Sequence, residues 1–416
     1  MKVAVLGYGV VGSAVVKFLI ENQRNIQARC GQSIEPVIAF SRSIKQDALI
    51  PMTTNFEELL YRKDIDVFVE LMGGIDEPFS MVSAILEQQK PVVTANKAML
   101  AYHRYELENL AKNVAFGYEA SVAGGIPIIK VLKEGLSANN ILSIKGILNG
   151  TSNYILTNMS KKGMDFDSVL KQAQKLGYAE ADPSFDIQGN DAAHKLLILA
   201  NIAFGLNAKP EDILCEGIAR ICTEDMYFAN EFGYTVKLLG IAKAKNQKVE
   251  LRVHPALIPQ EAMIAKVDGV MNAVSIVGDM LGESLYYGAG AGGVATASAV
   301  ICDLMDIAKN QTKAPLFGFK RDLGYALLEK EKIYTKYYLR LQAEDKIGVL
   351  SKITNLMSEN AISIESFLQN PKHNQSYSML FFTTHHTCEK SIINFLKILK
   401  KQDFIKDEPF MIRIEE

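Results

Sequence analysis

The stretch KVAVLGYGVVG, residues 2–12, decides the fold of the first part of this chain. An apolar strand (2–6) leads directly into a GxGxxG turn, and a helix follows. In such a turn Gly7 permits the tight bend, Gly9 lets a pyrophosphate approach the backbone, and Gly12 lets the helix pack on its strand. Because a helix N-terminus also attracts anionic phosphates, the stretch predicts a dinucleotide site rather than a purely structural glycine turn.

Short β-rich runs alternate with helical segments through the first third of the chain. The runs are KVAVL (2–6), PVIAF (36–40), DVFVEL (66–71), PVVTA (91–95) and VAFGY (114–118). Such alternation is typical of βαβ units and predicts a mostly parallel, Rossmann-type sheet in an α/β protein. We expect this domain to span 1–125, with a later helix, 293–309, packing back on it.

The pattern changes at about residue 125. An alternating strand, LSIKGIL, is followed by helices, by a hairpin across KNQK (245–248) and by a second glycine-rich stretch near residue 288. These features predict a separate α+β domain over 126–318. A charged connector, 312–335, leads out of it.

The remaining residues, 336–416, follow a third pattern. We expect its elements in the order strand, helix, strand, strand, helix, strand, at 337–343, 348–360, 362–368, 376–384, 388–401 and 409–414. This βαββαβ order is that of the ferredoxin-like split unit.

Composition excludes several classes of function. The chain has 45 basic and 47 acidic residues, a formal charge of -2 and no long run of one sign, which argues against a nucleic-acid or acidic-membrane partner. Its five cysteines contain no CxxC pair and fit neither a disulfide framework nor a zinc site. No apolar stretch approaches a membrane span, and the chain opens on a strand rather than a leader. We therefore expect a cytoplasmic protein with small-molecule partners.

The end of the second strand bears on the choice of cofactor. An acid there would bind the ribose hydroxyls of NAD, whereas an arginine suits the 2′-phosphate of NADP. The stretch AFSRSIK offers Ser41, Arg42 and Lys45, and no acid follows the strand. The sequence favours NADP, and NAD remains the alternative because Arg42 could be an exposed loop charge.

Two lysines are candidates for chemistry. In PVVTANKAML, Lys97 follows the fourth strand, at the sheet edge where ligands of open α/β folds bind, although a lysine there is commonly a solvated loop residue. In GNDAAHKLLILA (189–200), Asn190 is a plausible N-cap and Asp191 and Lys195 share one face. The helix that follows is apolar all round, which predicts burial and favours a proton donor held by its acid over a surface pair.

An acidic loop precedes this helix. The stretch GYAEADPSFD (177–186) contains Glu180, Asp182 and Asp186. Acids in a loop with glycine and proline are commonly caps and turn formers, but they could also bind the ammonium of an amino-acid substrate. Their spacing does not support a metal site. We interpret His194, on another face of the helix, as structural.

Together these motifs resemble the homoserine dehydrogenase family over residues 2–310. The resemblance is carried in order by GYGVVG, VELMGG, VVTANKAML, YEASVAGGIPII, ILNGTSNYI, GYAEADPSFDIQGNDAAHKLLILA and YYGAGAGGVATASAV. A resemblance to the ACT domain, a small regulatory module, is carried by the stretch RLQAEDKIGVLSKITNLMSENAISIESFLQ. The resemblance implies NAD(P)-dependent reduction of L-aspartate 4-semialdehyde to L-homoserine in threonine and methionine biosynthesis. It also implies that 126–318 is the catalytic and dimerisation domain of a homodimer or homotetramer.

The resemblance also implies residue roles. Lys195 matches the proton donor, while Asp191, Glu180, Asp186 and Lys97 match substrate contacts. The motifs and the resemblance together predict cofactor positions at Gly7, Gly9, Val10, Val11, Gly12, Arg42, Gly73, Lys97, Gly177 and Gly290. At the end of the second strand, where Arg42 lies, the sequence departs from the arginine-acid pattern that is commoner in the family. A Na⁺ or K⁺ site is implied at Glu119, Val122, Gly124 and Ile126. The family usually has proline where this chain has Ala295, so the entry angle of that helix is less fixed.

The turn from Asp345 to Gly348 opens a helix and offers backbone N–H groups to an amino-acid carboxylate. Threonine is the expected effector, and the alternative is that the module only dimerises. For the whole chain the alternatives are a related amino-acid-pathway dehydrogenase and a non-catalytic sensor of dinucleotide and amino acid. A sensor would not need the set of Lys97, Glu180, Asp191 and Lys195.

Overall fold

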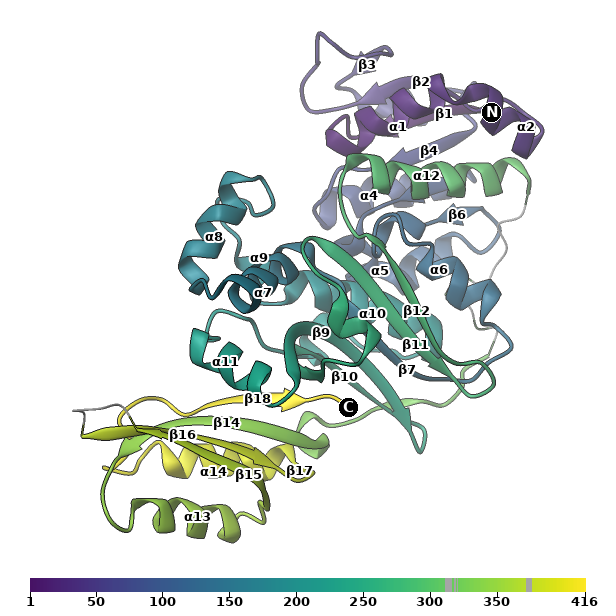
Figure 1. Ribbon diagram of the computed structural model, residues 1–416. Helices are drawn as coiled ribbons and strands as arrows, with labels where there is room; N and C mark the ends of the chain where they lie inside the picture. The colour runs from purple at the N-terminus through teal and green to yellow at the C-terminus, as the bar shows by residue number, and fades with distance from the viewer. Residues whose placement is uncertain (311–315, 318, 320, 372–375) are drawn as a thin grey trace.

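The structure, a computed structural model, describes residues 1–310, 316, 317, 319, 321–371 and 376–416. Its two sheets lie one after the other along the molecule, and the C-terminal strands and helices are at the end opposite the N-terminal sheet (Figure 1). The predicted boundary at residue 318 and part of the predicted connector lie outside the described residues. In the described part, no helix is both long and apolar enough to cross a membrane.

The N-terminal sheet is parallel throughout, which confirms the Rossmann-type prediction. Its order is β3-β2-β1-β4-β5-β6. The strands are β1 (Lys2–Leu6), β2 (Glu35–Phe40), β3 (Met52–Thr53), β4 (Val67–Glu70), β5 (Val92–Thr94) and β6 (Phe116–Gly117). The helices between them are α1 (Val10–Glu21), α2 (Gln23–Cys30), α3 (Phe56–Leu60), α4 (Asp76–Glu87) and α5 (Lys97–Leu110). Strand β3 was not predicted, because two residues are too few to show an alternating pattern.

A helix from much later in the chain joins this domain. Helix α12 (Gly293–Ala308) lies beside α1 (Figure 1), and its Val300 and Leu304 belong to the same buried cluster as Val15 and Leu19 of α1. The second glycine stretch immediately before α12 is thereby brought to the edge of the N-terminal sheet.

The middle of the molecule is an antiparallel sheet with helices on one face. Its order is β12-β11-β7-β9-β10. The strands are β7 (Ile141–Ile147), β9 (Tyr234–Lys245), β10 (Lys248–Pro259), β11 (Met271–Gly278) and β12 (Gly282–Ala289). The helices are α7 (Gly150–Lys162), α8 (Phe166–Lys175), α9 (Ser184–Ile187), α10 (Asn190–Phe204) and α11 (Thr223–Glu231). The hairpin predicted across 245–248 is confirmed: Lys245 pairs with Lys248.

Shorter elements complete the connections. They are η1 (Glu119–Ser121), α6 (Ile128–Lys130), η2 (Val131–Gly135), η3 (Pro210–Asp212), β8 (Leu214–Cys215), η4 (Met263–Lys266), β13 (Ala326–Leu327) and η5 (Lys330–Lys332).

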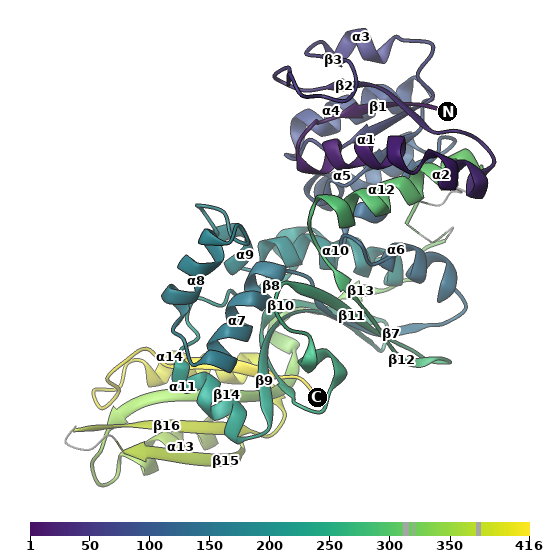
Figure 2. The same cartoon turned by 45° about the horizontal axis from the view of Figure 1, so that its top comes forward.

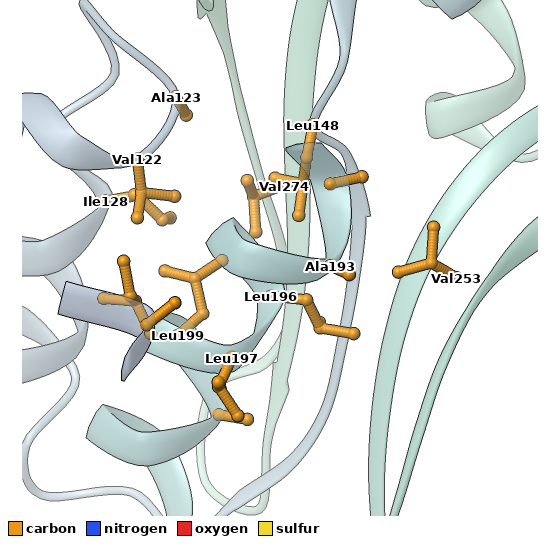
Figure 3. Packing of buried hydrophobic residues seen from close by; sticks show 14 of the residues in the cluster. Val122, Ala123, Ile128, Leu148, Ala193, Leu196, Leu197, Leu199, Val253 and Val274 are labelled. Carbon is orange, nitrogen blue, oxygen red and sulfur yellow. The ribbon is translucent and has the colours of Figure 1, made fainter. Parts of the chain in front are cut away.

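Helix α10 is the core of the middle region, and its predicted burial is confirmed. Every residue from Asp191 to Phe204 is buried. Its leucines pack with residues from the sheet and from the segment after β6, as Figure 3 shows for Leu196, Leu199 and Val274.

The start of α10 differs from the prediction. The N-cap is Gly189, with φ +87°, and Asn190 is the first helical residue, so Asn190 does not cap the helix. A Cβ on Gly189 would lie 3.0 Å from Cγ1 of Val253 and 3.2 Å from Sγ of Cys215. A glycine is required there by both its left-handed backbone and this close packing.

The C-terminal part confirms the predicted βαββαβ order. It consists of β14 (Tyr334–Glu344), α13 (Val349–Glu359), β15 (Ile364–Pro371), β16 (Tyr377–Thr384), α14 (Glu389–Leu399) and β18 (Phe410–Ile414), with a short β17 (Thr387–Cys388) before α14. The strand order is β18-β14-β16-β15. Helices α13 and α14 lie below β14 and β16 in Figure 1 and pack with these strands in one buried cluster; Figure 2 shows the same region from another side.

The C-terminal sheet is not a free-standing one. Strand β18 pairs in parallel with β10, with Ala256 opposite Arg413 and Leu257 opposite Ile414, so one sheet runs through both regions. Arg413 is fully buried at this junction, and its NH1 and NH2 donate to the Glu216 carboxylate at 2.8 and 2.9 Å. This edge of the C-terminal sheet is therefore occupied within the chain.

Candidate active site

The first glycine turn has the geometry that the motif predicts. Gly7 has φ +100°, and a Cβ there would lie 2.7 Å from the carbonyl oxygen of Leu71. A Cβ on Gly12 would lie 2.0 Å from the carbonyl oxygen of Gly7. Among the described residues nothing lies within 4 Å of a Cβ on Gly9. Gly7 and Gly12 are thus needed by the fold, while space is open at Gly9.

A cavity of about 500 Å³ opens where the N-terminal sheet meets α10. It is bounded by the start of α1, by the loops after β4 and β5, and by the second glycine stretch. Its lining includes Val11, Gly73, Lys97, Phe185, Lys195 and Gly290. The two predicted lysines, 98 positions apart, and residues of both glycine stretches are thereby brought to one cavity.

Asp191 links the two lysines. Its Oδ1 lies 2.8 Å from Nζ of Lys97, and its Oδ2 lies 2.8 Å from Nζ of Lys195. The Lys195 ammonium also donates to the carbonyl oxygen of Leu148 at 2.8 Å. The predicted i,i+4 pair is therefore part of a triad in which one buried carboxylate holds two cations, the buried Lys195 and the partly exposed Lys97.

Burial and charge act differently on the three groups. Burial alone would raise the pKa of the Asp191 carboxyl, but the charges of Lys195 and Lys97 hold it well below its ordinary value. Burial lowers the pKa of Lys195, and Asp191 offsets this only in part. Burial also opposes the charge on Lys97, yet Asp191 raises the pKa of Lys97 above its ordinary value. Of the two lysines, Lys195 more readily gives up its proton.

Two side chains that were not predicted from the sequence, those of Asn149 and Thr151, hold the acids in place. The Nδ2 group of Asn149 donates to Oδ1 of Asp186 at 2.7 Å and to Oδ2 of Asp191 at 2.9 Å. The Oγ1 group of Thr151 donates to Asp186 at 3.1 Å. Asn149 also caps α7. An Asn before Gly-Thr-Ser signals a helix cap, but nothing in the sequence showed that its amide reaches both acids.

Other predicted residues lie outside this cluster. Gly177 and Glu180 are exposed on the loop after α8. Arg42 is exposed after β2 and forms an ion pair with Glu77 at the start of α4. His194 lies between the rings of Tyr102 and Phe185, at centroid distances of 5.6 and 5.3 Å, in a packing position.

The turn predicted to hold a cation has a buried acid. The two carboxylate oxygens of Glu119 accept backbone N–H groups of Ile129 (2.8 Å) and Lys130 (2.9 Å). The Glu119 N–H donates to Asp303 of α12 at 2.8 Å. Burial raises the pKa of Glu119 to about 7 and that of Asp303 to about 7.

The predicted effector residues lie in the turn between β14 and α13. Gly348 is the N-cap of α13 with φ +86°. Asp345 accepts a hydrogen bond from Oγ of Ser378 at 2.8 Å, and its N–H donates to the carbonyl oxygen of Ser376 at 3.1 Å.

Fold and site together define a class: an NAD(P)-binding dehydrogenase with a Rossmann-type domain, a catalytic α+β domain and a C-terminal ACT domain. Three family profiles match the chain, described as the NAD binding domain of homoserine dehydrogenase (7–118), homoserine dehydrogenase (127–305) and the ACT domain (337–404). The chain belongs to the homoserine dehydrogenase family.

Individual relatives agree with this assignment over the whole chain. The homoserine dehydrogenase of Helicobacter pylori is 52% identical, with 100% of this chain and 99% of the relative covered. The crystal structure of a homoserine dehydrogenase from Thiobacillus denitrificans has a TM-score of 0.94 and 42% identity, covering 100% of this chain and 98% of that one. A hyperthermophilic archaeal homoserine dehydrogenase in complex with NADPH has a TM-score of 0.63 and 28% identity, covering 73% and 96%.

Proposed function

We propose that the chain catalyses the reversible reduction of L-aspartate 4-semialdehyde to L-homoserine, with Lys195 as the proton donor. The observation that carries this proposal is the Lys97–Asp191–Lys195 cluster at the cavity, in which the pKa of Lys195 is lowered and that of Lys97 is raised. The nicotinamide cofactor, when bound, supplies the hydride. The carbonyl oxygen of the substrate then needs a proton, and a lysine whose charged form is disfavoured is suited to give one.

The remaining residues take binding and positioning roles. Asp191 and the carbonyl oxygen of Leu148 fix the Lys195 ammonium. Lys97, with its raised pKa, stays charged and is suited to the substrate carboxylate. Glu180, exposed on the loop after α8, is suited to bind the substrate ammonium. Asp186 helps to position Asp191 indirectly, because the Nδ2 group of Asn149 donates to both carboxylates.

We favour NADP as the cofactor, with Gly7, Gly9, Val10, Val11, Gly12, Gly73, Gly177 and Gly290 contributing to its site. Arg42 follows β2, where a 2′-phosphate would lie, and the archaeal relative is in complex with NADPH. Glu77 pairs with Arg42 in this structure, so a 2′-phosphate would have to compete with that carboxylate.

We propose that the 119–126 turn binds a cation through backbone carbonyls. Since both oxygens of Glu119 accept backbone N–H groups, its side chain would supply charge, and the carbonyls of Val122, Gly124 and Ile126 would be the ligands of Na⁺ or K⁺. A higher melting temperature in NaCl or KCl than in tetramethylammonium chloride would support this site.

We propose further that threonine regulates the enzyme through the turn from Asp345 to Gly348. We also propose domain limits at 1–125, 126–318 and 336–416. The proposed assembly is a homodimer or a homotetramer, and the proposed setting is the cytoplasm. The cysteines of the described part are all free, which suits a reducing compartment. A thermal shift on adding threonine that is absent in Gly348→Val would support the sensor, and no shift with any aspartate-family amino acid would contradict it.

The activity itself is tested by steady-state oxidation of homoserine with NADP and with NAD, each with and without threonine. We expect turnover with a lower KM for NADP. Oxidation of NADPH with another aldehyde or imine, but not with aspartate semialdehyde, would indicate a related dehydrogenase. Cofactor binding without any turnover would indicate a sensor.

A further inference from the structure

The side chain of Asn272, at the start of β11, is buried without hydrogen bonds. The residue is 1% exposed, and among the described residues neither Oδ1 nor Nδ2 has a partner. A primary amide can donate two hydrogen bonds and accept two, so buried amides are normally paired. The position of this one therefore requires an explanation.

Asn272 lies directly against the second glycine stretch. A Cβ on Gly290 would lie 1.9 Å from Cγ and Nδ2 of Asn272 and 2.4 Å from its Oδ1. The amide thus covers the Cα of Gly290, which lines the cavity. A larger residue at position 290 would displace it.

Backbone hydrogen bonds hold the chain just before Gly290 and at Gly292. The carbonyl oxygen of Ala289 accepts the N–H of Gly125, and that of Gly292 accepts the N–H of Thr296. Among the described residues neither Gly290 nor Ala291 makes a backbone–backbone hydrogen bond. Free N–H and carbonyl groups therefore lie beside the free amide of Asn272.

The register places Asn272 between two parts of the site. On one side Asn272 pairs with Gly288 of β12, two residues before Gly290. On the other side its neighbour Ala273 pairs with Ile147 of β7, and the next residue, Leu148, accepts the Lys195 ammonium. Asn272 thus lies next to the glycine stretch and one strand away from the residue that anchors the proton donor.

We propose that Asn272 is a positioning residue for the second glycine stretch: its amide hydrogen-bonds the backbone of residues 290–292 when the nicotinamide end of the cofactor fills the cavity. The inference depends on the proposed function, since it assumes that the cavity takes this cofactor. Asn272 touches neither substrate nor cofactor and acts through the loop. It makes cofactor binding and closure of the loop favour one another.

The test compares Asn272→Leu with the wild-type protein. Leucine has a similar size and no polar atoms, so the melting temperature of the ligand-free protein should be unchanged or higher. The Kd for NADPH, measured by calorimetric titration, should rise roughly tenfold, the value of about one hydrogen bond. The KM for the cofactor should rise by more than kcat falls.

Asn153→Leu is the matched control. Asn153 is also a 1% exposed amide near this end of the sheet, but its Nδ2 donates to the carbonyl oxygens of Val267 and Met271 at 3.1 Å each. This variant should lower the melting temperature without changing the Kd. The same pattern in Asn272→Leu, a lower melting temperature with an unchanged Kd, would overturn the proposal.

A second pair of variants keeps the test independent of how Asn272→Leu folds. Gly290→Ala should destabilise the protein because its Cβ overlaps the amide, and Asn272→Ala should relieve that overlap in the double variant. The double variant should regain stability but keep weak cofactor binding, and wild-type affinity in it would contradict the proposal. If the wild-type protein bound no nicotinamide cofactor, the proposed function would fail first.

Discussion

Replacing Asp191 by asparagine tests the cluster at its centre. The change keeps the shape of the side chain but removes the charge that lies 2.8 Å from each of two ammonium groups. At an effective dielectric constant of about 20, each contact corresponds to a gross attraction of about 6 kcal/mol, which offsets the cost of burying the charges. Loss of one partner from a buried ion pair typically costs about 3–5 kcal/mol, so we expect a loss of that order in the free energy of unfolding.

The same change should move the pH dependence of turnover. Asp191 raises the pKa of Lys195, which burial lowers, so without the carboxylate that pKa falls further. Homoserine oxidation requires the neutral amine and should reach its plateau at lower pH, while aldehyde reduction requires the ammonium and should decline from lower pH. We also expect kcat to fall by about 10²–10³, as for a misplaced general acid.

The assay is kcat against pH in both directions, together with calorimetric unfolding. Asp186→Asn is the control, because Asp186 accepts from the neutral groups of Asn149 and Thr151. Asp186→Asn should shift the pH profile of kcat less than Asp191→Asn does. A folded Asp191→Asn with the wild-type kcat and pH profile would refute the reasoning.

Three further predictions follow from individual contacts. Gly9→Ala should melt near the wild-type temperature but bind dinucleotide at least about tenfold more weakly. Gly12→Ala should fold poorly, because its Cβ would lie 2.0 Å from a carbonyl oxygen. Melting curves and cofactor titration distinguish the two variants. Arg42→Ala should raise the KM for NADPH without raising that for NADH, and Glu77→Gln should lower the KM for NADPH; equal changes for both cofactors would exclude a 2′-phosphate site. Between about pH 4 and 7 the folded protein keeps a proton on Asp303 that the unfolded chain loses, so this group makes stability fall as pH rises, by about 1.4 kcal/mol per unit. Glu119, whose pKa is also raised, adds a slope of the same sign. Asp303→Asn should therefore make the slope less steep in denaturant unfolding, and an unchanged slope would contradict the raised pKa of Asp303.

Much of this site could be predicted because its signals are local. The apolar faces of 196–204 are sufficient to indicate a buried helix, and the Asp191–Lys195 spacing places both on one face. The contact between Lys97 and Asp191 could not be predicted, because it depends on how the end of β5 meets the start of α10. The carbonyl oxygen of Leu148 could not be found either, since a backbone group has no sequence signature.

The junction with the C-terminal part was also not predicted. The βαββαβ order is visible as alternation within 336–416, whereas the parallel pairing of β10 with β18 is short and joins residues 157 positions apart, with Ala256 opposite Arg413. Arg413 appeared only as an ordinary residue of a predicted strand. The pairing of the buried Arg413 with Glu216 depends on the tertiary contact and not on any local pattern.

The central claim is that Lys195 gives and takes the proton in the interconversion of homoserine and aspartate semialdehyde. The most direct measurement is kcat for homoserine oxidation by Lys195→Ala at saturating cofactor and substrate, with folding checked by calorimetry and cofactor binding by titration. We predict a folded variant that binds the cofactor and whose kcat is about 10²–10⁴ lower, partly restored by added primary amines. Near-normal turnover by a folded Lys195→Ala would contradict the claim.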